Sequence, residues 1–295
     1  MTLLPALPFR LHRNAAKGRA GAPVLDESGF RAAHDAITSW PGYASTPLVD
    51  LPGLARALGV GALRWKDEGG RFGLGSFKAL GGAYAVARHL ARTLAGRGIA
   101  ATDTDLTAGR HADLTRDITV TCATDGNHGR SVAWGAQRFH CRAVIYIHET
   151  VSEGRAATIA RFGADVRRVP GTYDDAVRRA AEDAATNGWT VVSDTSYPGY
   201  TDIPRDVMQG YRVMADEAFA QWTGTGPTHL FVQGGVGGVA AAVAAQAALH
   251  FGNAAPLLIV VEPDRFDCLY RSAVAGAPTP SPPGPDTLMA GLACG

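Results

Sequence analysis

A lysine, a glycine-rich loop and a polar loop in this sequence have the residue types that chemistry on a small molecule requires. Lys78 lies in "GSFKALGGAYAV", residues 75–86, between a glycine-serine turn and a run of small residues. Small residues let other groups approach the backbone closely, so the amine either extends to water along its apolar stem or has a partner inside the protein. Because most lysines are solvated surface residues, Lys78 indicates a site only together with further features.

The second feature is "QGGVGG", residues 233–238, which follows the apolar run "HLFV" and precedes a helical pattern. Consecutive glycines leave backbone N–H groups unobstructed, and a helix N-terminus adds partial positive charge, so this loop suits a phosphate. The phosphate-binding residues would be Gly234, Gly235, Val236, Gly237 and Gly238. The alternative is close packing of the helix on the strand with no ligand.

The third feature is "CATDGNHGRSVAWGA", residues 122–136, again between a predicted strand and a predicted helix. Asp125, Asn127 and His128 would follow the carboxyl end of a parallel strand, the edge where open α/β sheets build their sites. The alternative for Asp125 and Asn127 is helix capping around a Gly126 turn. We interpret His128, taken alone, as a structural residue.

Together the three features match pyridoxal phosphate. Its aldehyde bonds a lysine, its phosphate needs N–H donors, and its ring hydroxyl needs a neutral hydrogen-bond partner. We therefore predict that Lys78 holds this cofactor.

Apolar β-branched runs alternate with Ala-rich helical patterns along the chain. The predicted strands are residues 117–123, 142–147, 165–170, 190–195, 229–234 and 257–263. This alternation predicts an α/β fold with parallel sheets flanked by helices. Residues 91–117 are interpreted as a loop or irregular insertion, residues 275–286 as an exposed connection, and residues 234–249 as a buried helix too short to span a membrane.

Composition points to a globular protein with a small-molecule partner. The 295 residues are 46% hydrophobic and 19% charged, which predicts two lobes, and the net charge of +1 gives no footprint for nucleic acid or an anionic membrane. The four cysteines have no zinc spacing, so we expect no disulfide and no metal. The start "MTLLPALPFRLHR" lacks a basic leader and a cleavage site, and we expect a cytoplasmic protein.

Longer motifs carry a family resemblance. "KDEGGRFGLGSFKALGGAYAV", "DTSYPGYTDIPRDVMQGY" and "VVEPDRFDCLYRS", together with the two loops above, resemble the diaminopropionate ammonia-lyases, within the tryptophan synthase beta-like, fold type II group of pyridoxal-phosphate enzymes. The resemblance covers most of residues 9–295. The lysine and glycine motifs are shared with threonine dehydratases, whereas "RFGLGSFKALGGAYAV" and "DTSYPGYTDIP" point to the narrower family.

The resemblance implies a role for each site residue. Lys78 would form the imine with the cofactor, Asn127 would contact the ring hydroxyl, and residues 234–238 would bind the phosphate. Asp125 and Asp194 would face the substrate, with Lys78 or Asp125 removing the α-proton according to the enantiomer. The β-amino group would leave as ammonia, and hydrolysis would give pyruvate and a second ammonia. A carboxylate such as Asp194 suits a β-ammonium group, although an aspartate before Pro198-Gly199 is also typical of a turn.

The resemblance further implies a homodimer and a large lobe from residues 1–88 and 196–295, with a small lobe from residues 89–195 and the cofactor in the cleft between them. Members of the family continue beyond Gly295, so we expect the large lobe to lack its C-terminal part. No residue is assigned to the pyridine nitrogen, and Cys294 is not given that role. Three alternatives stay open: a threonine or serine dehydratase-like lyase, a non-catalytic cofactor-binding remnant, and a dinucleotide-binding oxidoreductase, which would leave Lys78 unexplained.

Overall fold

The computed structural model describes residues 8–14, 24–124, 126–282, 287 and 289–293. Its α-helices are α1 (Glu27–Thr38), α2 (Pro52–Leu58), α3 (Lys78–Ala95), α4 (Asp103–Thr107), α5 (Ala112–Thr115), α6 (Asn127–Arg138), α7 (Glu153–Ala160), α8 (Tyr173–Asn187), α9 (Asp202–Gln221), α10 (Gly238–Phe251) and α11 (Cys268–Ala275). Short 3-10 helices are η1 (Glu68–Gly73), η2 (Gly252–Ala254) and η3 (Ala290–Leu292). The strands are β1 (Leu48–Asp50), β2 (Arg64–Lys66), β3 (Thr119–Ala123), β4 (Arg142–His148), β5 (Asp165–Val169), β6 (Thr190–Val191), β7 (His229–Gln233) and β8 (Leu257–Val261).

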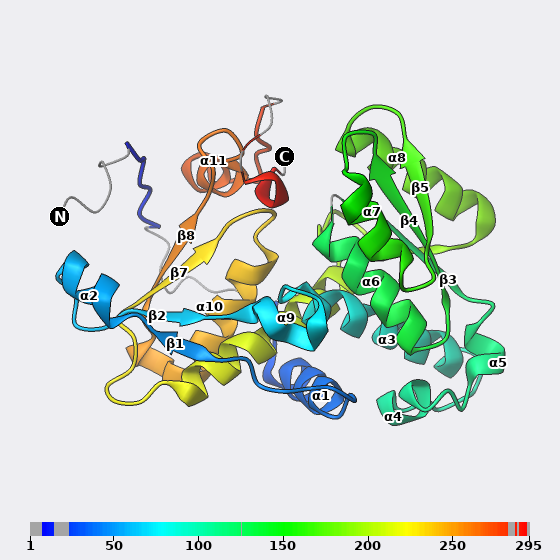
Figure 1. Ribbon diagram of the computed structural model, residues 1–295, viewed down its shortest axis with the longest axis horizontal. Coiled ribbons are helices and arrows are strands. Elements are labelled where there is room, and N and C mark those ends of the chain that lie inside the picture. Colours follow the sequence, from blue (N-terminus) through cyan, green and yellow to red (C-terminus); the bar gives the residue numbers. More distant parts are fainter. Residues whose placement is uncertain (1–7, 15–23, 125, 283–286, 288, 294–295) are drawn as a thin grey trace.

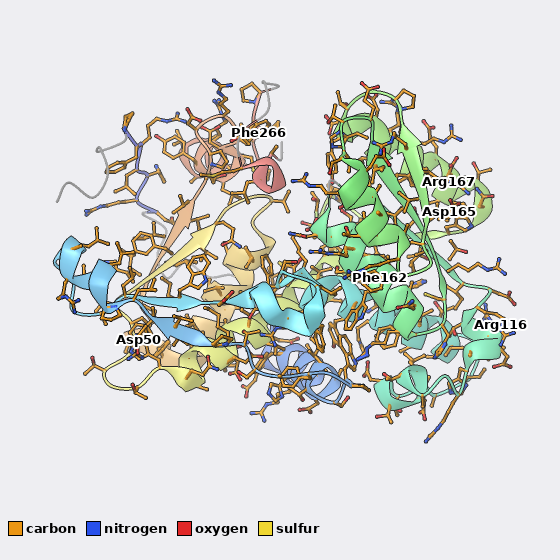
Figure 2. All side chains as sticks on the ribbon, in the orientation of Figure 1. Asp50, Arg116, Phe162, Asp165, Arg167 and Phe266 are labelled. Atoms are coloured by element: carbon orange, nitrogen blue, oxygen red, sulfur yellow. The ribbon has the colours of Figure 1, made fainter. Side chains whose placement is uncertain are left out.

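One half of the molecule is built on a four-stranded sheet with the order β5-β4-β3-β6, and every neighbouring pair is parallel. Its central strands β3 and β4 are almost wholly buried, because helices lie against the sheet and β-branched residues fill the space between them. The outer strand β5 is more exposed, and Asp165 and Arg167 on it form an ion pair at 2.9 Å (Figure 2).

The other half contains two smaller sheets, which lie apart from the four-stranded sheet in Figure 1. Strands β7 and β8 pair in parallel, with His229 opposite Leu257, and β1 and β2 form an antiparallel pair with Leu48 opposite Lys66. The glycine-rich loop connects β7 to α10, so the strand-loop-helix order predicted from the sequence is present.

Helix α3 packs against α6 on one side and against α9 on the other. Glycines at the contacts make this close approach possible. A Cβ on Gly82 would lie 1.9 Å from the Ser131 hydroxyl of α6, and a Cβ on Gly210 of α9 would lie 2.1 Å from the Leu80 carbonyl oxygen. The small residues after Lys78 therefore serve helix packing, and the first residue of α3 is fixed relative to both neighbouring helices.

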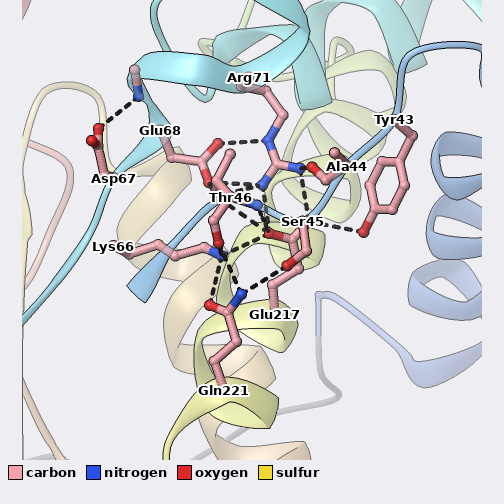
Figure 3. A network of polar contacts seen from close by, with 11 residues as sticks. Tyr43, Ala44, Ser45, Thr46, Lys66, Asp67, Glu68, Arg71, Glu217 and Gln221 are labelled. Carbon is pink, nitrogen blue, oxygen red and sulfur yellow. Dashed lines mark hydrogen bonds and ion pairs between the residues drawn. The ribbon is translucent and has the colours of Figure 1, made fainter. Parts of the chain in front are cut away.

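A buried ion network fixes the segment that leads into α3 (Figure 3). Arg71 is 1% exposed and donates to both carboxylate oxygens of Glu68 and to both of Glu217, with the Glu217 contacts at 2.7 Å. Lys66 donates to Glu217 at 2.7 Å, and the Tyr43 hydroxyl donates to Glu217 at 2.8 Å. Two cations and two carboxylates balance in charge, as buried ionic groups must. The network joins η1 and β2 to α9.

The structure corrects several boundaries. Residues 91–117, predicted to be irregular, continue α3 to Ala95 and include α4 and α5. Helix α4 forms because Thr102 and Asp105 cap it reciprocally. The strand predicted over 190–195 stops at Val191. Residues 276–282 lack helix and strand, as predicted for that connection, and residues 283–286 lie outside the described residues. The lobe boundaries stay a prediction, and residue 88 lies within α3.

Candidate active site

Lys78 is the first residue of α3, and its amine has a carboxylate partner. Nζ donates to Oδ2 of Asp194 at 2.5 Å, although 116 positions separate the two residues in sequence. The Lys78 side chain is 25% exposed and that of Asp194 is 16% exposed, so the pair lies mostly out of water but within reach of a small molecule. The amine therefore does not simply extend to solvent, which answers the alternative that the sequence left open.

Opposing effects set the charge of this pair. Burial alone would lower the pKa of Lys78 and raise that of Asp194, because it disfavours charge. Their mutual attraction outweighs burial, so the pKa of Lys78 is raised and that of Asp194 is lowered. The pair is an ammonium and a carboxylate across the neutral range.

A tyrosine hydroxyl shapes the segment that carries Asp194. Tyr200 Oη donates to the Val191 carbonyl at 2.8 Å and accepts from the Ser193 N–H at 2.9 Å. The Val192 N–H between these two groups still bonds the Thr121 carbonyl of β3 at 2.7 Å, so the tyrosine hydroxyl pairs the backbone groups on the opposite edge of the segment. A turn does form at Pro198-Gly199, with Tyr197 bridged to Tyr200, but the Asp194 carboxylate binds Lys78 instead of initiating that turn.

The polar loop before α6 is fixed by Thr124, whose hydroxyl accepts from the N–H groups of Gly126 at 2.9 Å and Gly129 at 3.1 Å. Asn127 is therefore not the cap. Its side chain is exposed, and its Oδ1 accepts from Arg130 at 2.6 Å, which leaves the NH₂ group of the amide as a donor. Asp125 lies outside the described residues, so its predicted role stays a prediction.

Arg130 connects this loop to the turn before Lys78. Its Nη2 lies 3.5 Å from the position a Cβ on Gly75 would take, and Gly75 has a positive φ of +72°. The guanidinium thus lies over that turn and close to Asn127 at once. Sequence reasoning did not single out Arg130, and its position three residues after Asn127 on one helix face is the local signal that could have found it.

The glycine-rich loop has the form of a phosphate cradle. Gly234 donates its N–H to Val261 at 2.7 Å, whereas among the described residues the N–H groups of Gly235, Val236 and Gly237 have no acceptor. Gly237 has a φ of +91°, which a side chain would strain, and a Cβ on Gly238 would lie 3.9 Å from the Asp194 carbonyl oxygen. The loop therefore lies beside the Lys78–Asp194 pair with free donors.

Three helices begin around this site: α3 at Lys78, α6 at Asn127 and α10 at Gly238. Each helix N-terminus carries partial positive charge and unpaired N–H groups. An amine, an amide donor and an open row of backbone donors fit the aldehyde, ring hydroxyl and phosphate of pyridoxal phosphate. A group of side chains suited to a metal ion does not occur among the described residues.

His128 belongs to this site, although its sequence position alone indicated a structural residue. It is 8% exposed; Nε2 bonds the Val192 carbonyl at 2.7 Å, and Nδ1 lies 3.8 Å from Asp194 Oδ2. Its Nδ1 is buried without a hydrogen-bond partner among the described residues. The sequence places His128 in the polar loop, but only the fold places it next to Asp194.

Comparison with known proteins agrees with this geometry. The sequence model of the family described as "Pyridoxal-phosphate dependent enzyme" matches residues 39–295. The chain belongs to this family. It is 42% identical over 260 residues to a diaminopropionate ammonia-lyase of Salmonella typhimurium and 39% identical over 278 residues to that of Escherichia coli. The matches cover 86% and 93% of this chain, which spans 64% and 68% of the length of those relatives.

Solved structures of the family superpose on the chain. The E. coli diaminopropionate ammonia-lyase, in complex with an aminoacrylate–PLP azomethine reaction intermediate, matches with a TM-score of 0.84 and 38% identity over 96% of this chain and 70% of that one. A tomato threonine deaminase matches with a TM-score of 0.66 and 23% identity, which shows the shared fold alone. The predicted α/β, fold type II architecture is confirmed.

Proposed function

We propose that the chain is a diaminopropionate ammonia-lyase that uses pyridoxal phosphate to convert 2,3-diaminopropionate to pyruvate and ammonia. Its similarity to two such lyases supports the reaction class. The observation that carries the proposal is the Lys78–Asp194 pair beside a glycine loop with free N–H donors. When bound, the cofactor supplies a conjugated ring that accepts the electron pair left at the substrate's Cα.

The residues of this chain would divide the remaining tasks. The free N–H groups at residues 235–238 would bind the phosphate, and the Asn127 amide, oriented by Arg130, would donate to the ring oxygen. Lys78 Nζ, after giving up one proton, would hold the cofactor and take the α-proton of one enantiomer. Asp125 is the candidate base for the other enantiomer.

Asp194 distinguishes a diamino substrate from a hydroxy amino acid. Its carboxylate is ionised and partly exposed next to Lys78, where a β-ammonium group would find an opposite charge. A β-hydroxyl group would gain much less there, which is why we favour diaminopropionate over serine or threonine.

The test measures pyruvate and ammonia released from 2,3-diaminopropionate and from serine, with Lys78→Ala as the control. Two ammonia for each pyruvate, faster release from diaminopropionate and dependence on Lys78 are expected. Faster release from serine would favour a dehydratase-like lyase. A cofactor absorbance band that needs Lys78, without any pyruvate, would instead mean that the chain binds the cofactor but does not catalyse the reaction.

We further infer a homodimer in the cytoplasm. The resemblance to the lyase family supports the dimer. Three free thiols, Cys122, Cys141 and Cys268, support a reducing compartment, and Cys294 lies outside the described residues. In the described part of the chain, no helix is long and apolar enough to cross a membrane. Light scattering after size-exclusion chromatography tests the dimer.

A further inference from the structure

We propose that His128 is the terminal acceptor of a proton relay that runs from Lys78 Nζ through the Asp194 carboxylate to His128 Nδ1. The relay would free the Nζ lone pair for attack on a carbonyl or for removal of a proton, and this use rests on the function proposed above. The relay itself follows from the contacts of these three side chains.

The hydrogen bond of the His128 ring fixes which of its nitrogens carries the hydrogen. Nε2 lies 2.7 Å from the Val192 carbonyl oxygen, which can only accept, so Nε2 carries a hydrogen and donates it. In the neutral ring Nδ1 then has a lone pair and no hydrogen. That lone pair is buried without a partner among the described residues, 3.8 Å from Asp194 Oδ2. Nδ1 is thus an open proton site facing a carboxylate.

The charge of the Asp194 carboxylate requires a cation beside it. While Lys78 Nζ is an ammonium 2.5 Å from Oδ2, it compensates the negative charge of Asp194. When Nζ becomes neutral, that ionised side chain, only 16% exposed, loses its cation. A largely buried carboxylate without a cation is unfavourable, so the site must retain the proton that Nζ releases.

Among the described groups around the pair, the His128 ring is the one that can accept the proton. Among the described residues, the other titratable groups close to the pair are Cys122 of β3, Tyr200, and Tyr211 of α9. Burial raises the pKa of each, so they stay neutral and take no proton. An imidazole nitrogen is a much stronger base than a carboxylate. The proton therefore passes to Oδ2 and, once the 3.8 Å gap to Nδ1 closes to hydrogen-bond distance, stops at Nδ1.

The relay balances in atoms and charge. One N–H bond of the ammonium breaks, its electron pair stays on Nζ, an O–H bond forms and breaks at Oδ2, and an N–H bond forms at Nδ1. The three groups have a net charge of zero before and after the transfer, because the positive charge moves from the lysine to the imidazolium. A buried site tolerates this transfer because no net charge appears in it.

The decisive test uses nitrogen NMR of the histidine rings in the chain without cofactor or substrate, so it does not depend on lyase activity. At about pH 8 an ordinary histidine is neutral, and we expect the wild-type His128 to carry one ring proton. In Lys78→Met, where Asp194 has no ammonium, the doubly protonated ring of His128 should become about tenfold or more as abundant. Adding Asp194→Asn to that variant should return the ring to one proton. A ring that stays singly protonated in Lys78→Met would overturn the relay.

A kinetic test measures how fast the Lys78-dependent absorbance band appears when pyridoxal phosphate is added. His128→Gln keeps an amide donor for the Val192 carbonyl but cannot take a proton, and it should slow this step by about 10²-fold near neutral pH. The difference should vanish at high pH, where solvent hydroxide deprotonates Nζ. His89→Gln, a change on the same helix as Lys78 but outside this site, should behave as wild type. Equal rates in His128→Gln and wild type would contradict the proposal.

Discussion

Glu217→Gln would test whether the buried ion network holds the segment that leads into Lys78. Arg71 and Lys66 both contact Glu217 at 2.7 Å, and Glu217 is 7% exposed. The substitution leaves two buried cations with one remaining carboxylate, Glu68. Removing one partner of a buried pair costs about 3–5 kcal/mol of unfolding free energy, and we expect a loss of that size at neutral pH.

The same network gives a pH dependence with a definite sign. Burial raises the pKa of Glu217, but Arg71 and Lys66 outweigh it and lower the pKa from 4.5 to about 2. Because the folded-state pKa lies below the unfolded one, the stabilisation is fully present above about pH 4.5 and is lost as the pH falls toward 2. At about 1.4 kcal/mol for each pH unit, roughly 3 kcal/mol should disappear over that range.

The assay is denaturant unfolding followed by circular dichroism, at several pH values between neutrality and pH 3. Wild type should lose stability across the acid range, and Glu217→Gln should lack that part of the loss. Glu153→Gln is the matched control, because Glu153 also pairs with an arginine but has an 89% exposed side chain, and it should cost at most about 1 kcal/mol. If Glu217→Gln were as stable as this control, with the pH profile of wild type, the reasoning about the network would be wrong.

Three further changes have definite expected outcomes. Gly210→Ala should cost about 1–3 kcal/mol in denaturant unfolding, because its Cβ would meet the backbone of α3 at 2.1 Å, and an unchanged midpoint would contradict that packing. Arg130→Met frees the Asn127 amide to flip, so cofactor binding, titrated by absorbance, should weaken about tenfold, and equal affinity would refute the orienting role. Asp194→Asn removes the charge that raises the pKa of Lys78, so the Lys78-dependent cofactor band should form at lower pH than in wild type. If the pH midpoint of band formation does not move, Asp194 does not control the pKa of the Lys78 amine.

Much of the fold could be predicted from periodicity, because buried parallel strands are continuous apolar runs. All six predicted strands exist, and each pairs in parallel with another of the six: β3 with β4 and β6, β4 with β5, and β7 with β8. The β1–β2 pair was missed because its strands are three residues long and none of their residues is buried. Strand β6 was predicted too long: the Val192 N–H still bonds Thr121 of β3, but no further ladder bond follows it among the described residues.

The site was predictable as far as local sequence carries it. Lys78, Asn127 and the glycine loop were singled out as candidates because each stands in a strand-loop-helix or turn context with its own chemical logic. The contacts that join them are long-range: the pairing of Lys78 with Asp194, the approach of His128, and the closure of the network by Glu217 depend on how helices far apart in sequence pack. Only the Glu68–Arg71 spacing gave a local sign of the network.

The three helix N-termini around Lys78 also bear on how the protein should be handled. Their partial charges and free N–H groups attract any small anion, and not only the cofactor's phosphate. If residues 235–238 bind the cofactor's phosphate as proposed, inorganic phosphate or sulfate in a purification buffer would compete for the same N–H groups and slow cofactor loading. Chain prepared in a buffer of weakly binding anions should take up the cofactor faster, so the apparent cofactor content of a preparation will depend on the salt in which it was made.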